Sequence, residues 1–509
     1  MQKRVLLFLI NAFLINMIAY AVFLLRGQDY ISWTLAGISS MTSVSFCLKY
    51  MALSLVTAVI IPLVLYSIQK KKRQITKSIV EDAIKPSTEE TDNEAGMTTG
   101  QSYAPPPTQC LKNRKAGIEP AKLFIYTLIF YLTFMVTASL MSRGGDLAVH
   151  GLIAVENVSL RNPFLIFQRI SYPVWHILTN IFYRLFGDVI YAAAFVTAGF
   201  NLFTTIVIYN ILKRYLKEKF SANTICAITF LLSFVTAIWL PWFSPHIYLG
   251  PASPTLWHNP TSNAVKGLSI LFFFLYMDIY AEKDLNGKNR MTLRQMAFMT
   301  GLMFLSTLLK SSFIVLFIPS AFILLLIDLI RSKGKNIVFC LQTALVCIPA
   351  LVPTLHQYIY SYSADTKRGG LAFSFMAVAS SRTTNVPLTL MLPYMFPALV
   401  YLLQYKDIYK NKRLFFALIM VIVSTVYYLF FAEANNPLNN ELGWPRALAM
   451  IIIWVVTAIE FFNTYHQSRH TEVRASRKNM ISVGFVLMFM HFFTGVIYYV
   501  GYGFMGIVR

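Results

Sequence analysis

Long apolar runs restrict the fold of this chain more than any other feature of its sequence. Stretches such as Phe124 to Met141 approach the roughly 20 residues that an α-helix needs to cross a bilayer. Such runs recur along most of the 509 residues, of which 56% are hydrophobic and only 13% are charged. Because lipid offers the backbone no hydrogen-bond partner, each spanning segment must be helical. We therefore predict an all-α fold, a polytopic transmembrane helical bundle.

The positions of Lys and Arg orient these spans. Apolar length predicts about 13 spans, at residues 5–25, 48–68, 121–142, 188–212, 222–243, 262–281, 295–309, 312–330, 336–355, 389–404, 414–432, 447–463 and 481–503. With the N-terminus in the cytoplasm, most of the 44 Lys and Arg fall on the cytoplasmic side, as the positive-inside rule requires. The net charge of +22 therefore indicates orientation, and no nucleic-acid partner is expected.

One long polar segment divides the chain. Residues 69–120 are rich in charge, contain several prolines and are nearly without aromatics, which is typical of a flexible linker, here cytoplasmic. Before it we expect an N-terminal transmembrane hairpin, residues 1–68, whose first apolar stretch is longer than that of a signal peptide. After it we expect a transmembrane catalytic body, residues 121–509.

The segment that follows the predicted span 121–142 is too polar to cross the bilayer and too aromatic for a free loop. We expect it to form one or more amphipathic helices on the outer membrane surface. Asp146 and His150 lie four residues apart in it, so a helix would present both on one face. The pair suits acid/base chemistry or a cation ligand, whereas an Asp after two glycines also suits a helix N-cap.

Two aromatic motifs extend this outer surface. Tyr172, Trp175 and His176 in YPVWH fit either an aromatic belt at the interface or a sugar-binding wall. In the stretch SPTLWHNPTSNAVK, Asn259 precedes a proline, so the turn should be rigid and aim Trp257, His258 and Asn259 into a cavity. We expect Thr261 to cap the following helix. Lys266, a turn further on, would either anchor the helix at the interface or pair with a phosphate.

Outer arginines form a further group of candidates. Arg382 and Arg446 lie on the predicted outer side against the orientation rule, and Arg suits bidentate recognition of phosphate. Glu441 and Trp444 stand close to Arg446 in the stretch NELGWPR. We therefore take Arg382, Glu441, Trp444 and Arg446 as candidate substrate-binding residues.

Metal binding has little support from the pattern of ligand residues. The five cysteines show no CxxC pairing, and the histidines show no HExxH spacing, so we expect no protein metal site. A divalent cation as cofactor at Asp146 is left open.

The order of these parts resembles the GT-C superfamily of polytopic glycosyltransferases. The likeness rests on GGDLAVH, SYPVWH and SPTLWHNPT, which look like motifs of bacterial surface-polysaccharide membrane proteins. It implies interfacial helices on the outer face, a polyprenyl-linked sugar donor, a glycan or lipid-linked acceptor, and an essential carboxylate in the first outer loop of the module. No DxD or ExD pair surrounds Asp146, which departs from the fuller pattern.

The resemblance implies roles for the candidate residues. Asp146 would be the general base that deprotonates the acceptor hydroxyl, and His150 and His176 would orient it or bind sugar hydroxyls. Trp257, His258 and Asn259 would shape the sugar pocket. The departing phosphate would be stabilised by three cations, Lys266, Arg382 and Arg446. The enzyme would act at the outer face of a bacterial cytoplasmic membrane.

Three other interpretations stay open. A polysaccharide polymerase or ligase uses the same lipid chemistry but transfers a whole oligosaccharide. A transporter or flippase for lipid-linked sugars would carry ionisable groups at the bilayer midplane and broken helices. A scaffold of an envelope assembly complex would leave the outer polar residues without a role.

Overall fold

The computed structural model describes residues 119–158, 166–167, 170–240, 253–282, 290–362, 370–383, 385–439, 441–472 and 474–505. The chain divides into two units, Met1–Thr127 and Leu128–Arg509. The second unit contains nearly all of the described residues. The predicted hairpin at 1–68 and linker at 69–120 lie outside the described residues, except for residues 119 and 120.

The first part of the unit is a series of helices of unequal length. In chain order they are α3 (Pro120–Ser142), α4 (Asp146–Glu156), α6 (Pro173–Phe186), α7 (Val189–Leu216), α8 (Ala222–Leu232), α9 (Pro260–Ala281), α10 (Leu293–Leu309), α11 (Ser312–Arg331) and α12 (Ile337–Tyr362). The described part of the segment expected at the membrane surface includes the helices α4 and α6, of 11 and 14 residues. Both are too short to cross a bilayer.

The second part mixes short and long elements. They are β1 (Leu371–Phe373), α13 (Ala377–Arg382), α14 (Val386–Met391), η3 (Leu392–Tyr394), α15 (Met395–Leu403), α16 (Lys412–Phe430), β2 (Phe431–Glu433), η4 (Glu441–Gly443), α17 (Trp444–His470), α18 (Ala475–Val500) and η5 (Gly501–Met505). The two strands pair antiparallel, with Leu371 opposite Glu433 and Phe373 opposite Phe431. Apart from this small ribbon, the described fold is helical, as predicted.

Nine helical segments of the described chain are long and apolar enough to cross a membrane. They are Pro120–Ser142, Val189–Leu216, Pro260–Ala281, Ser312–Arg331, Ile337–Ile359, Val386–Leu403, Lys412–Phe430, Glu441–His470 and Ala475–Met505. Each overlaps a predicted span, and the polytopic all-α prediction is confirmed at this level. The two predicted spans nearest the N-terminus lie outside the described residues, and two others, α8 and α10, are shorter helices of 11 and 17 residues.

The span predicted at 222–243 is wrong in its length, because α8 ends at Leu232. Residues 235–240 have no regular secondary structure and run along α18. Thr236 N donates to the backbone oxygen of His491 at 3.4 Å, and the ring of His491 lies 2.6 Å from Thr236 O through Nδ1. A Cβ added at Gly495 would lie 1.6 Å from Phe234 O, so this close approach requires glycine.

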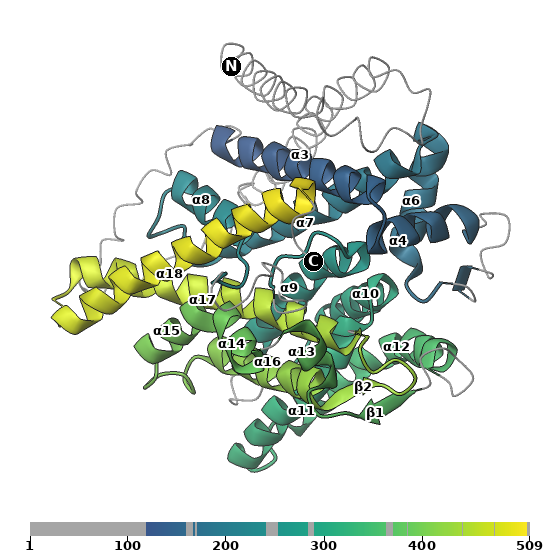
Figure 1. Ribbon diagram of the computed structural model, residues 1–509. Helices are drawn as coiled ribbons and strands as arrows, with labels where there is room; N and C mark the ends of the chain where they lie inside the picture. Colours follow the sequence, from purple (N-terminus) through teal and green to yellow (C-terminus); the bar gives the residue numbers. More distant parts are fainter. Residues whose placement is uncertain are drawn as a thin grey trace, which may run out of the picture. The chain divides into compact units, whose positions relative to one another are not determined.

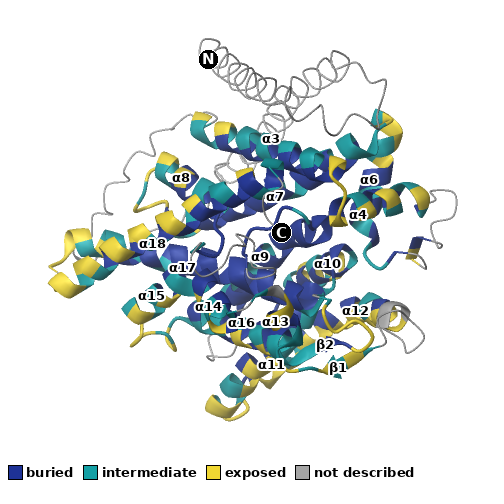
Figure 2. Ribbon diagram, viewed as in Figure 1, coloured by how far each residue is buried: buried dark blue, intermediate teal, exposed yellow. Residues whose placement is uncertain are grey.

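Helices α9 and α17 occupy the interior of the bundle (Figures 1 and 2). Within their apolar windows 78% and 94% of the residues are buried, against 28% in the window of α12 and 33% in that of α18. Helix α9 packs against α7 and α10, while α17 packs against α16 and α11. The exposed faces of α12 and α18 carry large apolar side chains such as Val352 and Phe489, as expected of helices that face lipid.

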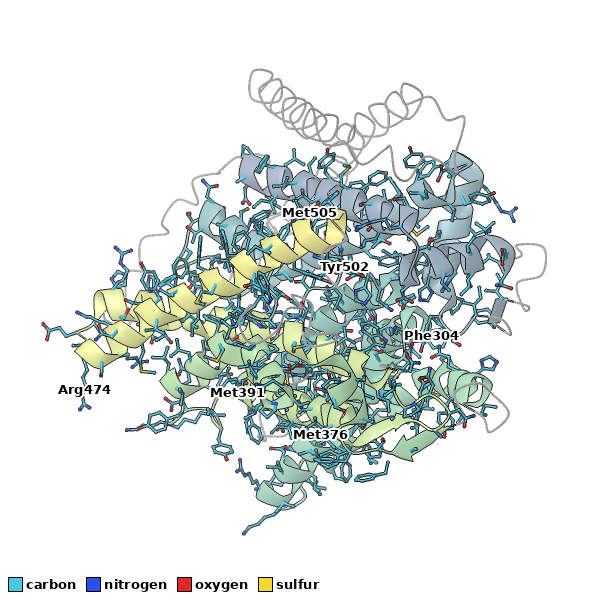
Figure 3. The ribbon with its side chains drawn as sticks, viewed as in Figure 1. Phe304, Met376, Met391, Arg474, Tyr502 and Met505 are labelled. Atoms are coloured by element: carbon cyan, nitrogen blue, oxygen red, sulfur yellow. The ribbon has the colours of Figure 1, made fainter. Side chains whose placement is uncertain are left out.

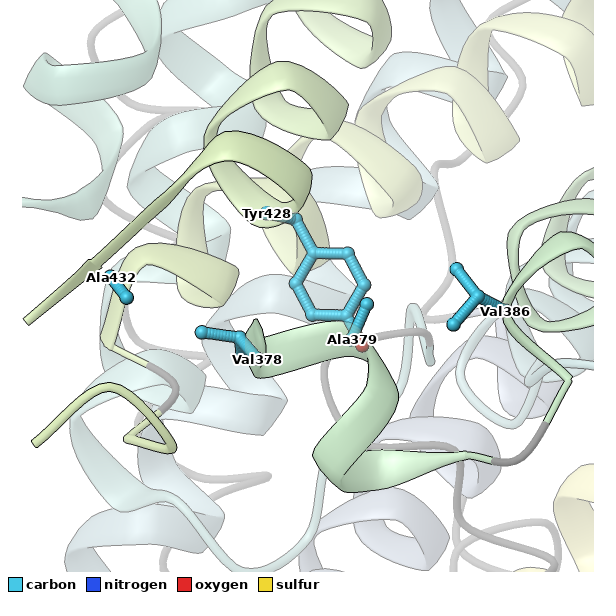
Figure 4. Packing of buried hydrophobic residues seen from close by; sticks show 5 residues of the cluster. All are labelled: Val378, Ala379, Val386, Tyr428 and Ala432. Atoms are coloured by element: carbon cyan, nitrogen blue, oxygen red, sulfur yellow. The ribbon is translucent and has the colours of Figure 1, made fainter. Parts of the chain in front are cut away.

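The segment between α12 and α15 is folded onto α16. Val378, Ala379 and Val386 pack around the ring of Tyr428, with Ala432 of β2 completing the cluster (Figure 4). All five are buried. This packing and the β1–β2 pairing hold α13 and α14 against α16.

Candidate functional site

Four polar residues from distant parts of the chain meet where several helices begin or end. Asp146 opens α4, Asn259 precedes α9, Lys310 separates α10 from α11, and Glu441 opens η4. Asn259 Nδ2 donates to Asp146 Oδ2 at 2.7 Å, and Lys310 Nζ lies 3.4 Å from Asn259 Oδ1. Lys310 Nζ also lies 3.9 Å from Glu441 Oε2. We call these four residues the polar cluster.

The orientation of the Asn259 amide is fixed by its surroundings. Its Oδ1 accepts from Ser262 N at 2.9 Å and from Thr261 Oγ1 at 3.1 Å, and it also faces the ammonium group of Lys310. Because donors surround the oxygen, the amide nitrogen must be the atom that donates to Asp146. Asn259 is thus the N-cap of α9, and the expectation that Thr261 caps this helix is wrong.

Asp146 is placed by a turn of two glycines. Gly144 and Gly145 have φ values of 82° and 86°, a region that side chains other than hydrogen disfavour. The N-cap position of α4 is Gly145, without a side-chain cap, so Asp146 does not serve as the N-cap that its sequence context also allowed. Its carboxylate is 40% exposed and remains open to a ligand.

Two histidines continue from Asp146 into the protein. His176 Nδ1 lies 2.8 Å from Tyr172 O, and because a carbonyl only accepts, this nitrogen carries the proton. His176 Nε2 must then accept, so His150 Nδ1, at 2.9 Å, donates to it. The remaining nitrogen, His150 Nε2, has a lone pair and faces Asp146 Oδ1 at 3.6 Å. The tautomers follow from this hydrogen-bond logic.

Burial favours the neutral state of both rings. It lowers the pKa of His150 from its ordinary value, mainly by desolvation, although the negative charge of Asp146 acts in the opposite direction. Desolvation, followed by the proximity of His150, lowers the pKa of His176 to about 3. At neutral pH two proton acceptors, His150 Nε2 and Asp146 Oδ1, therefore face each other. A hydroxyl group between them could give its proton to either.

Lys310 brings a cation into the polar cluster and was missed by sequence analysis. Its side chain is 2% exposed, and its Nζ lies 4.7 Å from the ring centroid of Trp444 and 5.4 Å from that of Tyr172. Such stacking favours a desolvated ammonium. One signal could have identified it: the predicted topology puts Lys310 on the outer side, against the positive-inside rule.

The aromatic candidates occupy different depths. Trp175 is fully buried and donates its Nε1 to Thr197 Oγ1 at 3.2 Å. Its ring packs edge-on against the rings of His150 and His176. His258 lies between the rings of Trp444 and Tyr502, with centroid distances of 5.8 and 5.9 Å. Tyr502 is labelled in Figure 3. Tyr172 and Trp444 contact the polar cluster directly, because their rings face the ammonium group of Lys310.

Two further candidates, Trp257 and Lys266, lie apart from the polar cluster. Trp257 packs against Phe234 and Tyr499, with centroid distances of 5.7 and 5.2 Å. Lys266 is buried in the second turn of α9, where its Nζ lies 3.3 Å from Asn263 Oδ1. Both line a separate small cavity. The three side chains of WHN therefore do not converge on one pocket, because consecutive residues of the turn point to different neighbours.

The candidate Arg446 contacts two tyrosines and forms no recorded contact with the polar cluster within the described residues. Arg446 is fully buried, and its guanidinium lies 4.9 Å from the ring centroid of Tyr428 and 5.7 Å from that of Tyr394. None of its three nitrogens forms a well-aligned hydrogen bond within the described residues. Arg382 ends α13, and its side chain lies outside the described part.

The described residues contain no group of three or more His, Cys, Asp or Glu side chains that could hold a metal ion. The polar cluster and His150 supply proton acceptors and one buried cation.

The fold defines the class: this is a multi-pass helical membrane protein. Comparison of the chain with protein-family models, curated proteins and solved structures finds no match.

Proposed function

We propose that the protein is a membrane glycosyltransferase that moves a sugar from a polyprenyl-phosphate-linked donor to a hydroxyl of an extracytoplasmic glycan or lipid-linked acceptor. The observation that carries the proposal is the gap between Asp146 Oδ1 and His150 Nε2, two acceptors 3.6 Å apart. This distance is too long for a hydrogen bond between them, and a substrate hydroxyl can donate to either.

The proposed reaction uses this arrangement. The acceptor hydroxyl donates to the Asp146–His150 pair, and its oxygen attacks the anomeric carbon of the donor sugar. The new bond from carbon to oxygen forms as the bond to the phosphate oxygen breaks, and the lipid phosphate leaves with that electron pair. The proton stays on the pair, where a protonated His150 would be held by the carboxylate.

Lys310 is the cation best placed to meet the departing phosphate. It is buried, and its Nζ lies 3.4 Å from Oδ1 of Asn259, the residue whose amide nitrogen donates to Asp146. A desolvated ammonium stabilises developing negative charge more strongly than one in water. The proposal therefore gives the phosphate role to Lys310 in preference to Lys266 and Arg446, which lie in other surroundings.

A flippase for lipid-linked sugars is the second candidate, and two observations favour it. Arg446 is fully buried within a membrane-spanning segment. The segment Val386–Leu403 is broken into α14, η3 and α15. Interrupted helices and buried charges are common in transporters.

A reconstituted system separates the two candidates. Purified protein in liposomes receives radiolabelled polyprenyl-phosphate sugars and a glycan acceptor, and both product formation and movement of unreacted donor across the bilayer are measured. We expect transfer by the wild type and a loss of about 100-fold or more with Asp146→Asn. The matched control is Asp407→Asn, which removes an exposed carboxylate paired with Lys410 and should leave transfer unchanged.

The opposite outcome is equally specific. If unreacted donor crosses the bilayer, no transfer is seen, and Asp146→Asn behaves like Asp407→Asn, the protein is a translocator and the proposed reaction is wrong.

A further inference from the structure

A small cavity lies inside the bundle, away from the polar cluster. Its volume is about 20 Å³, and helices α3, α7, α9 and α17 line it together with the segments at 232–233 and 255–257. Its lining includes Lys266, Trp257, Thr133, Asn201 and Thr204. None of the residues of the polar cluster borders it, so it needs a separate explanation.

Within the described part of the chain, Lys266 brings an unbalanced charge to this cavity. Lys266 is 6% exposed, and its only hydrogen-bond partner within the described residues is the neutral amide oxygen of Asn263. No carboxylate of the described part forms an ion pair with it. An ammonium in a low-dielectric interior is costly unless an opposite charge accompanies it.

The cavity also offers hydrogen-bond donors without acceptors. Trp257 is 3% exposed, and its Nε1, which can only donate, has no acceptor within the described residues. Thr133 Oγ1 accepts from Asn201 Nδ2 at 3.5 Å, which leaves its own proton to donate. Lys266, Trp257 and Thr133, which carry a cation, an indole N–H and a hydroxyl, therefore all line one small space.

We propose that this cavity binds a small inorganic anion of halide size, chloride in cellular media, between Lys266 and Trp257. The anion would neutralise the ammonium and accept a hydrogen bond from the indole N–H. A water molecule could accept the same hydrogen bond but could not neutralise the charge. A space of about 20 Å³ accommodates one particle of about the size of water. The proposed anion is structural, and its binding does not depend on the glycosyltransferase activity.

Halide-dependent stability tests this site in the purified full chain. We would measure the Tm in detergent while sodium gluconate is replaced by sodium chloride or bromide at constant ionic strength. Gluconate is too large for the cavity and serves as the reference anion. An anion that binds only the folded state raises the Tm in a saturable manner, so we expect a saturable rise with both halides.

Substitutions assign the effect to the cavity. Lys266→Met removes the charge at similar length and should abolish the rise, while Trp257→Phe should weaken it. Lys310→Met removes the other buried lysine and should keep the rise. If Lys266→Met does not fold, bromide identified by its anomalous scattering in wild-type crystals decides the question.

Two results would overturn the proposal. One is a wild-type Tm that is the same in chloride, bromide and gluconate, with no anomalous bromide signal between Lys266 and Trp257. The other is a halide response that persists in Lys266→Met at the same half-saturating concentration as in the wild type.

Discussion

Asn259 has two structural roles, and one substitution can separate them. Its Oδ1 caps α9 and its Nδ2 donates to Asp146. Asp is as good an N-cap as Asn, so Asn259→Asp should keep the cap but replace a donor to Asp146 by a second carboxylate.

We predict that Asn259→Asp loses most of the transfer activity, about 10-fold or more in kcat, with a Tm close to the wild type. Asn259→Ala should lose activity and also about 1 kcal/mol of stability, because the cap is gone. Kinetics and thermal denaturation of the two variants check this. Full activity in Asn259→Asp would show that the amide donor does not matter.

The histidines give the protein a definite dependence on pH. The pKa of His176 is about 3 in the folded state, and burial also lowers that of His150, against about 6.5 for an unfolded histidine. Between these values the unfolded chain binds more protons than the folded one. Stability therefore falls as pH drops below about 6.5 and continues to fall toward about 3.

Transfer activity should also fall as the pH drops, because the neutral ring of His150 accepts the proton in the proposed reaction. Asp146, Lys310, Glu441 and His176 are the titratable groups that face this ring. We predict that kcat is kept at pH 7 and declines in acid below the ordinary histidine pKa. The Tm of His176→Asn, measured from pH 7 to 4, should fall less steeply than that of the wild type. Equal slopes would exclude His176 as the source.

At the scale of elements, the extended segment after α8 depends on one glycine of α18. A Cβ at Gly495 would meet the backbone oxygen of Phe234, which cannot yield as a flexible side chain does. We predict that Gly495→Ala destabilises the protein by about 1–3 kcal/mol or more. The control is Gly301→Ala in α10, where a Cβ meets nothing within 4 Å. There the higher helix propensity of Ala should raise the free energy of unfolding by about 0.5–1 kcal/mol.

Thermal denaturation of these two variants in the same detergent gives the comparison. A Gly495→Ala protein as stable as the wild type would show that residues 233–236 do not pack on α18 as described.

The elements also show which features a sequence can predict. Long apolar runs identified the nine candidate spans of the described residues, because a bilayer imposes their length. The same criterion overestimated α8, since apolar residues that pack on α18 as extended chain count like helical ones. Composition cannot distinguish the two conformations over a few residues.

At the scale of the whole molecule, the sequence predicted part of the polar cluster. Asp146, Asn259 and Glu441 were candidates because polar residues between spans share one side of the membrane. The direction of each side chain could not be predicted. Trp257 and Lys266 turn toward an interior cavity and Arg446 toward two tyrosines, since contacts between distant helices decide these positions. Lys310 was missed because a lone lysine between two apolar runs resembles an interfacial anchor.

The most direct test of the account is a double-mutant cycle on the proton-accepting pair, Asp146→Asn and His150→Gln, with kcat for sugar transfer as the readout. If the two residues accept one proton as a unit, each single variant loses about 100-fold or more, and the double variant loses little beyond the larger single loss. Losses that multiply in the double variant would show that the residues act independently. Unchanged transfer in both single variants would contradict the proposed site.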